Sequence, residues 1–133
     1  MKKIVIDATI DNLGLVKKFI CDELLESDCL SSINKDIIVA AEEIFVNIAS
    51  YAYAHIGCVS VEVKVDDVAT IRFSDGGMPF DPLEKEDPNF SLEIEDRCAG
   101  GNGIYMVKKL MDEVDYVYED EKNILTIKRL LRC

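Results

Sequence analysis

The sequence of 133 residues has little positive charge. Lysine and arginine number 15 against 26 aspartates and glutamates, so the formal net charge is −11. No basic stripe runs along the chain, which argues against nucleic acid and anionic membranes as partners. The acidity suits a basic protein partner, although most acidic surfaces are merely solvated. Any phosphate ligand would need a metal ion, helix termini and backbone N–H groups to overcome the field of the protein.

Long apolar runs and paired cysteines are also missing. No apolar stretch reaches the roughly 18 residues of a membrane span, and Asp7 comes too early for a signal peptide. The five cysteines are an odd number without a C-x-x-C pair, so we expect reduced thiols and no zinc site. We therefore expect a cytoplasmic protein with a single domain over residues 1–133 and no membrane segment.

Three common catalytic signatures are absent. The chain has no Gly-Lys-Ser/Thr of a P-loop and no H-R-D of a eukaryotic-type kinase. It has no dinucleotide G-x-G-x-x-G either, because Met106 stands where the third glycine belongs. His55 is the only histidine, and it lies near the end of a predicted helix, where it serves more simply as a partner of the helix dipole than as a catalyst.

Hydrophobic periodicity predicts about three helices and five strands. The helices are expected over residues 12–27, 34–54 and 103–111, with a loop at 28–32, and the strands over 3–10, 59–65, 68–74, 114–118 and 124–130. Asp66 and Asp67 predict a tight turn, and a charged turn from Glu119 to Asn123 joins the last two strands. This order predicts an α+β two-layer sandwich, with the helices on one face of a mixed sheet.

The first of three polar groups lies in the second predicted helix. Glu43 and Asn47 are four residues apart and therefore project from the same helical face. On one interpretation Glu43 is simply exposed beside Glu42 and Asn47 is hydrogen-bonded locally. On the other, the pair faces a water-filled cavity, where Asn47 could ligate Mg²⁺ and Glu43 could accept a proton from an attacking hydroxyl or water.

The second group follows the strand at residues 68–74. The carboxylate of Asp75 is suited to accept the exocyclic amino N–H of adenine. Gly76 and Gly77 permit a positive φ and the close approach of a flat ring. The alternative is an ordinary turn at the end of a strand, since D-G and G-G are common there.

The third group, Gly100, Gly101 and Gly103, leads into the third predicted helix. The free N–H groups and the dipole of a helix start suit phosphate oxygens, although such glycines also occur without a ligand. Between Ser74 and Gly103 lies a long segment with three prolines and no clean period. A structureless loop of this length is either functional or a sign of a mistaken assignment.

In this order and spacing the three groups resemble the N, G1 and G2 boxes of the GHKL (Bergerat-fold) ATP-binding superfamily. The stretches 101–112 and 123–129 resemble its anti-sigma factor serine/threonine kinase branch, and the resemblance covers about residues 5–130. It implies ATP and Mg²⁺ as cofactors and a lid at about 78–101. By the resemblance, Glu43 is the catalytic base and Asn47 is the Mg²⁺ ligand. Asp75 and Gly77 contact adenine, and Thr126 helps to hold it. Gly101 and Gly103 contact the phosphates.

Two positions depart from the family pattern. Pro79 stands at the second glycine of the D-x-G-x-G box, which stiffens the hinge of the lid. Ala99 stands where some kinases of the branch place a basic residue against the phosphates, so Lys85 or Arg97 would have to replace it.

The resemblance implies a function and its partners. It implies an anti-sigma factor that holds a sigma factor and phosphorylates a small anti-anti-sigma (STAS-like) protein, with a possible homodimer. A nucleotide-sensing binding module with little or no phosphotransfer is the rival. A larger ATPase machine is disfavoured, because no second domain is present to couple the work.

Overall fold

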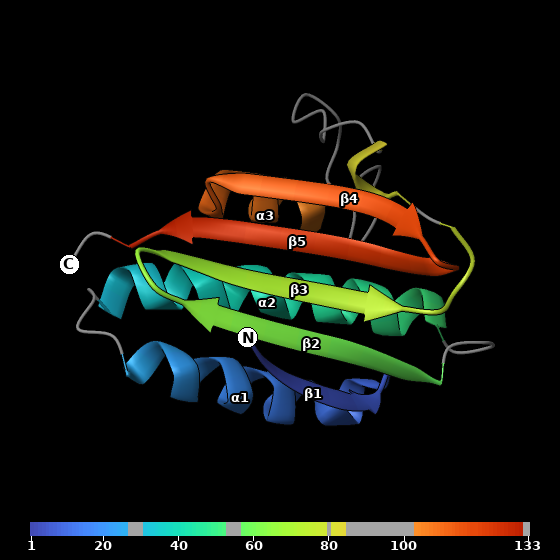
Figure 1. Ribbon diagram of the computed structural model, residues 1–133, viewed down its shortest axis with the longest axis horizontal. Helices are drawn as coiled ribbons and strands as arrows, with labels where there is room; N and C mark the ends of the chain where they lie inside the picture. The colour runs from blue at the N-terminus through green and yellow to red at the C-terminus, as the bar shows by residue number, and fades with distance from the viewer. Residues whose placement is uncertain (27–30, 53–56, 80, 85–102, 132–133) are drawn as a thin grey trace, which may run out of the picture.

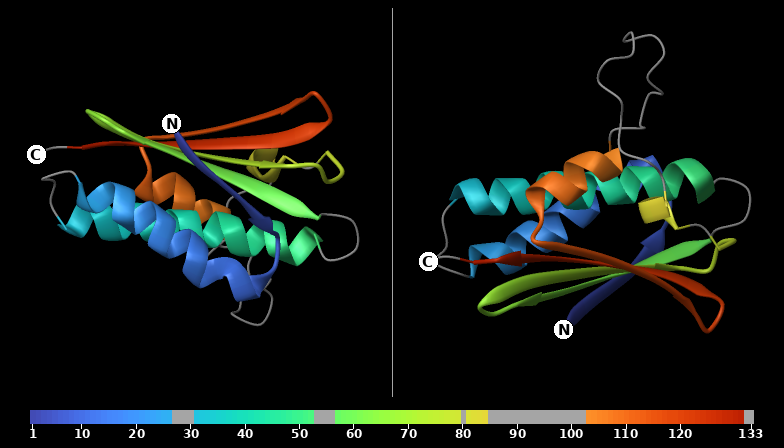
Figure 2. Two further views of the ribbon diagram at one scale, coloured as in Figure 1. Left: turned by 60° about the horizontal axis from the view of Figure 1, so that its bottom comes forward. Right: turned by 90° about the horizontal axis from the view of Figure 1, so that it is seen from above.

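The computed structural model describes residues 1–26, 31–52, 57–79, 81–84 and 103–131. In these ranges five strands form one sheet, and the α-helices cover one of its faces (Figures 1 and 2). The α+β two-layer sandwich is thereby confirmed. None of the helices in the described ranges is both long and apolar enough to cross a membrane. The elements in chain order are β1 (Lys2–Asp7), η1 (Ile10–Asn12), α1 (Leu13–Leu25), α2 (Ser31–Ala52), β2 (Cys58–Val65), β3 (Val68–Asp75), η2 (Pro82–Glu84), α3 (Gly103–Leu110), β4 (Glu113–Glu119) and β5 (Lys122–Leu130).

The strand order in the sheet is β1-β2-β3-β5-β4, and every neighbouring pair is antiparallel. The prediction of a mixed sheet is therefore wrong. β3 and β4 do run in the same direction, as expected for two strands joined through a helix (Figure 1). They are not neighbours, however, because β5 folds back from β4 and inserts between them.

The core lies between the sheet and α2. It is formed by the apolar residues of the two predicted patterns, the alternation along the strands and the helical stripe of α2. Alternate residues of β2 and β3 are buried, as the period of two requires. On α2 the buried side chains follow the helical period and face these strands. The residues that are at most 1% exposed include Ile37, Ala41, Ile44, Phe45, Val59, Val61, Val63, Ala69, Ile71 and Phe73.

Two element boundaries differ from the prediction. β1 ends at Asp7 rather than at residue 10, because the Asn12 side-chain amide donates to the Asp7 carbonyl (2.8 Å) and turns the chain into η1. α2 begins at Ser31, so the predicted loop at 28–32 is wrong for Ser31 and Ser32.

β5 fixes the C-terminal end of α3. The guanidinium of Arg129 donates to the carbonyl of Leu110 and pairs with Asp36 of α2 at 3.4 Å. The backbone N–H of Asp112 donates to the carbonyl of Lys128 (2.9 Å). A cation at this end satisfies a carbonyl that has no partner within the helix, and it complements the helix dipole. These bonds hold α3 against β5 and α2, which also determines where its first residue lies.

The two hairpin turns differ in backbone conformation. At the predicted turn between β2 and β3, the N–H of Val68 donates to Asp66 Oδ1 (3.0 Å), and this bond holds the pKa of Asp66 below its usual value. The β4–β5 turn contains only Asp120 and Glu121, with φ of 52° and 62°. The prediction that this turn reaches residue 123 is wrong, because Asn123 belongs to β5.

The β4–β5 turn gives a test of the fold. The left-handed conformation costs an L-residue about 1–2 kcal/mol, and glycine avoids that cost. We therefore expect Glu121→Gly to raise the free energy of unfolding by about 0.5–1 kcal/mol, after the added entropy of the unfolded chain is deducted. Urea denaturation measures the change. The control is Asp67→Gly, in a turn without a positive φ, which should destabilise; an equal gain in both variants would contradict the assigned turn geometry.

Candidate active site

Asp75 is a buried carboxylate at the end of β3. Its side chain is 8% exposed and points to the helix side of the sheet, in phase with the core residues of β3. The N–H of Gly77 donates to Asp75 Oδ1 (2.9 Å), and the side-chain amide of Asn123 donates to the same oxygen (3.1 Å). Both bonds to described residues fall on Oδ1. The second oxygen, Oδ2, is left available to a donor from a ligand.

Asn123 is a site residue that the sequence analysis missed. It lies directly opposite Asp75 in the β3–β5 pairing. Its Nδ2 also approaches the carbonyls of Met78 (2.9 Å) and Gly77 (3.4 Å), and its Oδ1 accepts the hydroxyl of Tyr116. The predicted five-residue turn had placed Asn123 outside the sheet. The two-residue turn extends β5 back to Lys122 and so includes Asn123 in the strand.

The chain that follows Asp75 is only partly open to solvent: Gly76, Met78 and Pro79 are exposed, whereas Gly77 is buried. Gly76 does not adopt a left-handed φ, so the positive φ that glycine permits is not used there. A Cβ on Gly76 would meet nothing within 4 Å. Met78 is 79% exposed. A little further on, Asp81 accepts the N–H of Leu83 (2.8 Å) at the start of η2.

Glu43 of α2 lies against the first residue of α3. A Cβ built on Gly103 would stand only 2.8 Å from Glu43 Oε2. The absent side chain of Gly103 therefore makes room for the carboxylate beside the helix start, where the dipole favours a negative charge. The structure thus brings together two of the predicted groups, which are 60 residues apart in the sequence.

Asn47 lies one turn after Glu43 on α2 and is half-buried. The structure gives its carboxamide no hydrogen bond to another described residue, so its oxygen is uncommitted. Within the described ranges no three His, Cys, Asp or Glu side chains form a group that could hold a metal ion. A hard cation near α2 would thus take the Asn47 oxygen together with phosphate oxygens and water, a donor set that fits Mg²⁺.

Much of the predicted lid lies outside the described residues. Of residues 78–101 only 78, 79 and 81–84 are described, and Gly101 is outside these ranges. The same holds for Ala99 and for the two cations considered as its replacement, Lys85 and Arg97. These positions remain predictions.

Thr126 is not brought to Asp75. Along β5 the side chains alternate, and Asn123, Leu125 and Ile127 are buried on the helix side. Thr126 therefore faces the opposite side of the sheet, in register with Arg72 of β3. The structure thus corrects the predicted placement of Thr126 beside the base, and Asn123 is the residue of β5 that lies directly opposite Asp75.

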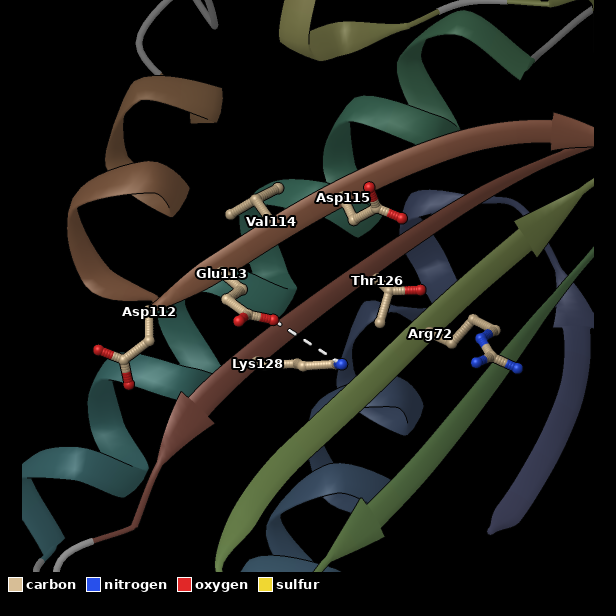
Figure 3. A pocket seen from close by; sticks show the side chains of 7 residues that line it. All are labelled: Arg72, Asp112, Glu113, Val114, Asp115, Thr126 and Lys128. Carbon is tan, nitrogen blue, oxygen red and sulfur yellow. Dashed lines mark ion pairs between the residues drawn. The ribbon is translucent and has the colours of Figure 1, made fainter.

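The outer face of the sheet carries a hollow of about 570 Å³ around Thr126. Its charged residues are two cations and three carboxylates: Arg72, Lys128, Asp112, Glu113 and Asp115 (Figure 3). One cation is already paired, since Lys128 lies 3.8 Å from Glu113. The carboxylates outnumber the cations, and the described α-helices all lie on the opposite face of the sheet (Figure 2). The hollow is therefore a poorer phosphate site than the start of α3.

The fold and these groups can be compared with known proteins. The sequence matches the family of histidine kinase-like ATPase domains over residues 6–129. The match covers most of the chain, so this chain belongs to that family, and the predicted superfamily is confirmed.

A solved structure shows the same fold. The crystal structure of the RsbU and RsbW domains of Rv1364c from Mycobacterium tuberculosis matches with a TM-score of 0.65 and 20% sequence identity. The match covers 100% of this chain and 34% of that one, so this chain spans about a third of the longer protein. A comparison with curated proteins gives no significant match.

The contact between Glu43 and Gly103 can be tested without a ligand. Alanine in a helix is favoured over glycine by up to about 1 kcal/mol, but in Gly103→Ala the new Cβ must displace the Glu43 carboxylate. We expect little or no stabilisation in the parent and roughly 0.5–1 kcal/mol in a Glu43→Ala background. Denaturation of the four proteins of this cycle measures the coupling.

Gly14→Ala is the matched control for this cycle. Gly14 lies in α1, and a Cβ there meets nothing within 4 Å. The substitution should therefore stabilise both backgrounds equally. A zero coupling between positions 43 and 103 would contradict the contact.

Proposed function

We propose that this chain is an ATP- and Mg²⁺-dependent serine/threonine protein kinase that acts as an anti-sigma factor and phosphorylates a small anti-anti-sigma (STAS-like) partner. The observation that carries the proposal is the Glu43 carboxylate seated against Gly103 at the start of α3, on the same side of the sheet as the buried carboxylate of Asp75. Membership of the histidine kinase-like ATPase family supports the nucleotide. The assignment to the serine/threonine kinase branch rests on residues 101–112 and 123–129, which resemble that branch.

In this proposal the adenine base lies at the end of β3. Asp75 Oδ2 accepts the amino N–H of adenine, since Oδ1 is already occupied by Gly77 and Asn123. Guanine presents a carbonyl oxygen at the same ring position. Two acceptors would then face each other, so a 6-oxo purine binds less well than a 6-amino purine.

The phosphates lie toward the start of α3. Backbone N–H groups at the start of α3, near Gly103, would bind the phosphate oxygens, because the helix dipole favours negative charge there. Gly101 is proposed as a further phosphate contact on the resemblance alone. Asn47 would hold Mg²⁺, which when bound supplies the positive charge that a chain of net charge −11 lacks.

Glu43 is proposed as the general base. A serine or threonine hydroxyl of the partner attacks the γ-phosphorus, and the bond from that phosphorus to the β–γ bridging oxygen breaks. Glu43 accepts the hydroxyl proton, the partner becomes a phosphomonoester, and ADP leaves. The position of the carboxylate beside Gly103 supports this role, because the phosphates are proposed to lie at the same helix start.

The proposed partners are a sigma factor and the anti-anti-sigma protein, and the kinase is proposed to act as a homodimer. The RsbW domain of the Mycobacterium tuberculosis protein has this fold, and that likeness is compatible with an anti-sigma role. One observation favours the nucleotide-sensing module instead. Ala99 stands where some kinases of the branch place a basic residue against the phosphates, so that positive charge is missing at this position.

A substitution at Glu43 that keeps the shape of the side chain but removes its charge separates the two functions. Glu43→Gln should leave ATP affinity within a few-fold, because the proposed base and phosphate contacts remain. Transfer of labelled γ-phosphate to the STAS-like partner should fall by about 10²-fold, the lower end for a positioned base, since a loose transition state needs little early proton removal.

The neighbouring residue supplies the control. Glu42 pairs with Lys17 at 3.5 Å, so Glu42→Gln should leave transfer unchanged. Full transfer by Glu43→Gln would defeat the assigned role. Negligible transfer by the parent, together with ATP-dependent partner binding that is unaffected by Glu43→Gln, would establish the sensing module.

A further inference from the structure

Asn123 is a buried polar side chain to which the proposed reaction assigns no step. It is 9% exposed, and it lies on the same side of β5 as the core residues Leu125 and Ile127. A buried amide is costly unless its donors and acceptor are satisfied. Here the amide N–H groups face three acceptors, and the hydroxyl of Tyr116 donates to the amide oxygen.

These contacts permit only one orientation of the amide. Asp75 Oδ1 and the carbonyls of Gly77 and Met78 are all acceptors, so the NH₂ end must face them. If the amide were flipped, its oxygen would meet these three oxygens. The Tyr116 hydroxyl can donate or accept, and in this orientation it donates to Oδ1 and satisfies the amide oxygen.

The amide in turn limits the rotation of the Asp75 carboxylate. Oδ1 accepts both from the Gly77 N–H at 2.9 Å and from Asn123 at 3.1 Å, so the carboxylate cannot turn without losing both bonds. The same amide ties this carboxylate to the carbonyls of the turn that follows it. One side chain therefore fixes both the carboxylate and the backbone beside it.

We propose that Asn123, whose amide oxygen Tyr116 bonds, is the positioning residue for base selection: it holds Asp75 Oδ2 toward the ligand, so that the site prefers 6-amino over 6-oxo purine nucleotides. The inference rests on the proposed nucleotide site. It extends that site to two residues that need not touch the base.

The test measures the Kd of Mg·ATP and of Mg·GTP by calorimetric titration. Asn123→Asp keeps the shape of the side chain, but it replaces the donor by an acceptor facing Asp75. At pH 8 we expect ATP affinity to fall roughly 5- to 150-fold, with a smaller change for GTP. Near pH 5.5 part of the loss should be recovered, because two carboxyls that share a site retain a proton that can bridge them.

A milder variant keeps the test valid if Asn123→Asp fails to fold. Tyr116→Phe removes only the hydroxyl that bonds the amide oxygen and leaves that buried oxygen without this donor, so it should loosen Asn123 and lower the preference for ATP over GTP roughly 2- to 10-fold. Tyr118→Phe removes the hydroxyl of a tyrosine on the same strand that is 43% exposed, and Thr126→Val changes the other face of β5. Both should keep the preference of the parent.

The outcomes separate this inference from the proposed function. If the folded parent binds no nucleotide, the proposed function fails and the inference falls with it. If the parent binds ATP without preference over GTP, or if Tyr116→Phe keeps the preference of the parent, the inference is overturned and the ATP site stands. An equal loss for ATP and GTP in the folded variants would show a merely structural role and would also overturn it. A selective loss of ATP, restored at low pH in Asn123→Asp, supports the inference.

Discussion

The buried carboxylate of Asp75 needs a donor beside it, and the pairing of β5 with β3 supplies that donor. The register places Asn123 opposite Asp75. A slip of one residue would turn Asn123 to the outer face and leave the carboxylate without its amide partner. The two-residue turn at Asp120 and Glu121, both with positive φ, sets the register of the neighbouring β4–β5 pair, in which Tyr118 lies opposite Asn123. The pairing of β5 with β3 is a separate, long-range contact, and it is this contact that determines which residue faces Asp75.

The same strand positions the other half of the candidate site. Near its end β5 carries Arg129, which bonds the carbonyl of Leu110 at the end of α3 and pairs with Asp36 of α2. Because α3 is held there against α2, its first residue, Gly103, lies against Glu43. β5 therefore fixes the carboxylate at the end of β3 through its first residues, and the start of α3 through its last ones.

The fold was largely predictable from the sequence because it depends on periodic patterns. Alternation in β2 and β3 and the apolar stripe of α2 are local signals, and the structure follows them. The antiparallel sheet and the residue facing Asp75 were missed for one physical reason. Both depend on where β5 pairs, which is a long-range choice that the spacing of Asn123 and Thr126 does not reveal. The proximity of Glu43 to Gly103 was implied only by the family resemblance.

The central claim is that a nucleotide binds on the helix side of the sheet, between Asp75 and the start of α3. NMR spectra of the chain titrated with Mg·ATP test this claim directly. The largest shifts should fall on the backbone amides of Gly77 and Gly103 and on the side-chain amide of Asn123, while Thr126 and Lys128 on the outer face change little. If the largest shifts fall on Thr126 and Lys128 in the outer hollow and the amides of Gly77 and Gly103 do not shift, the account is contradicted.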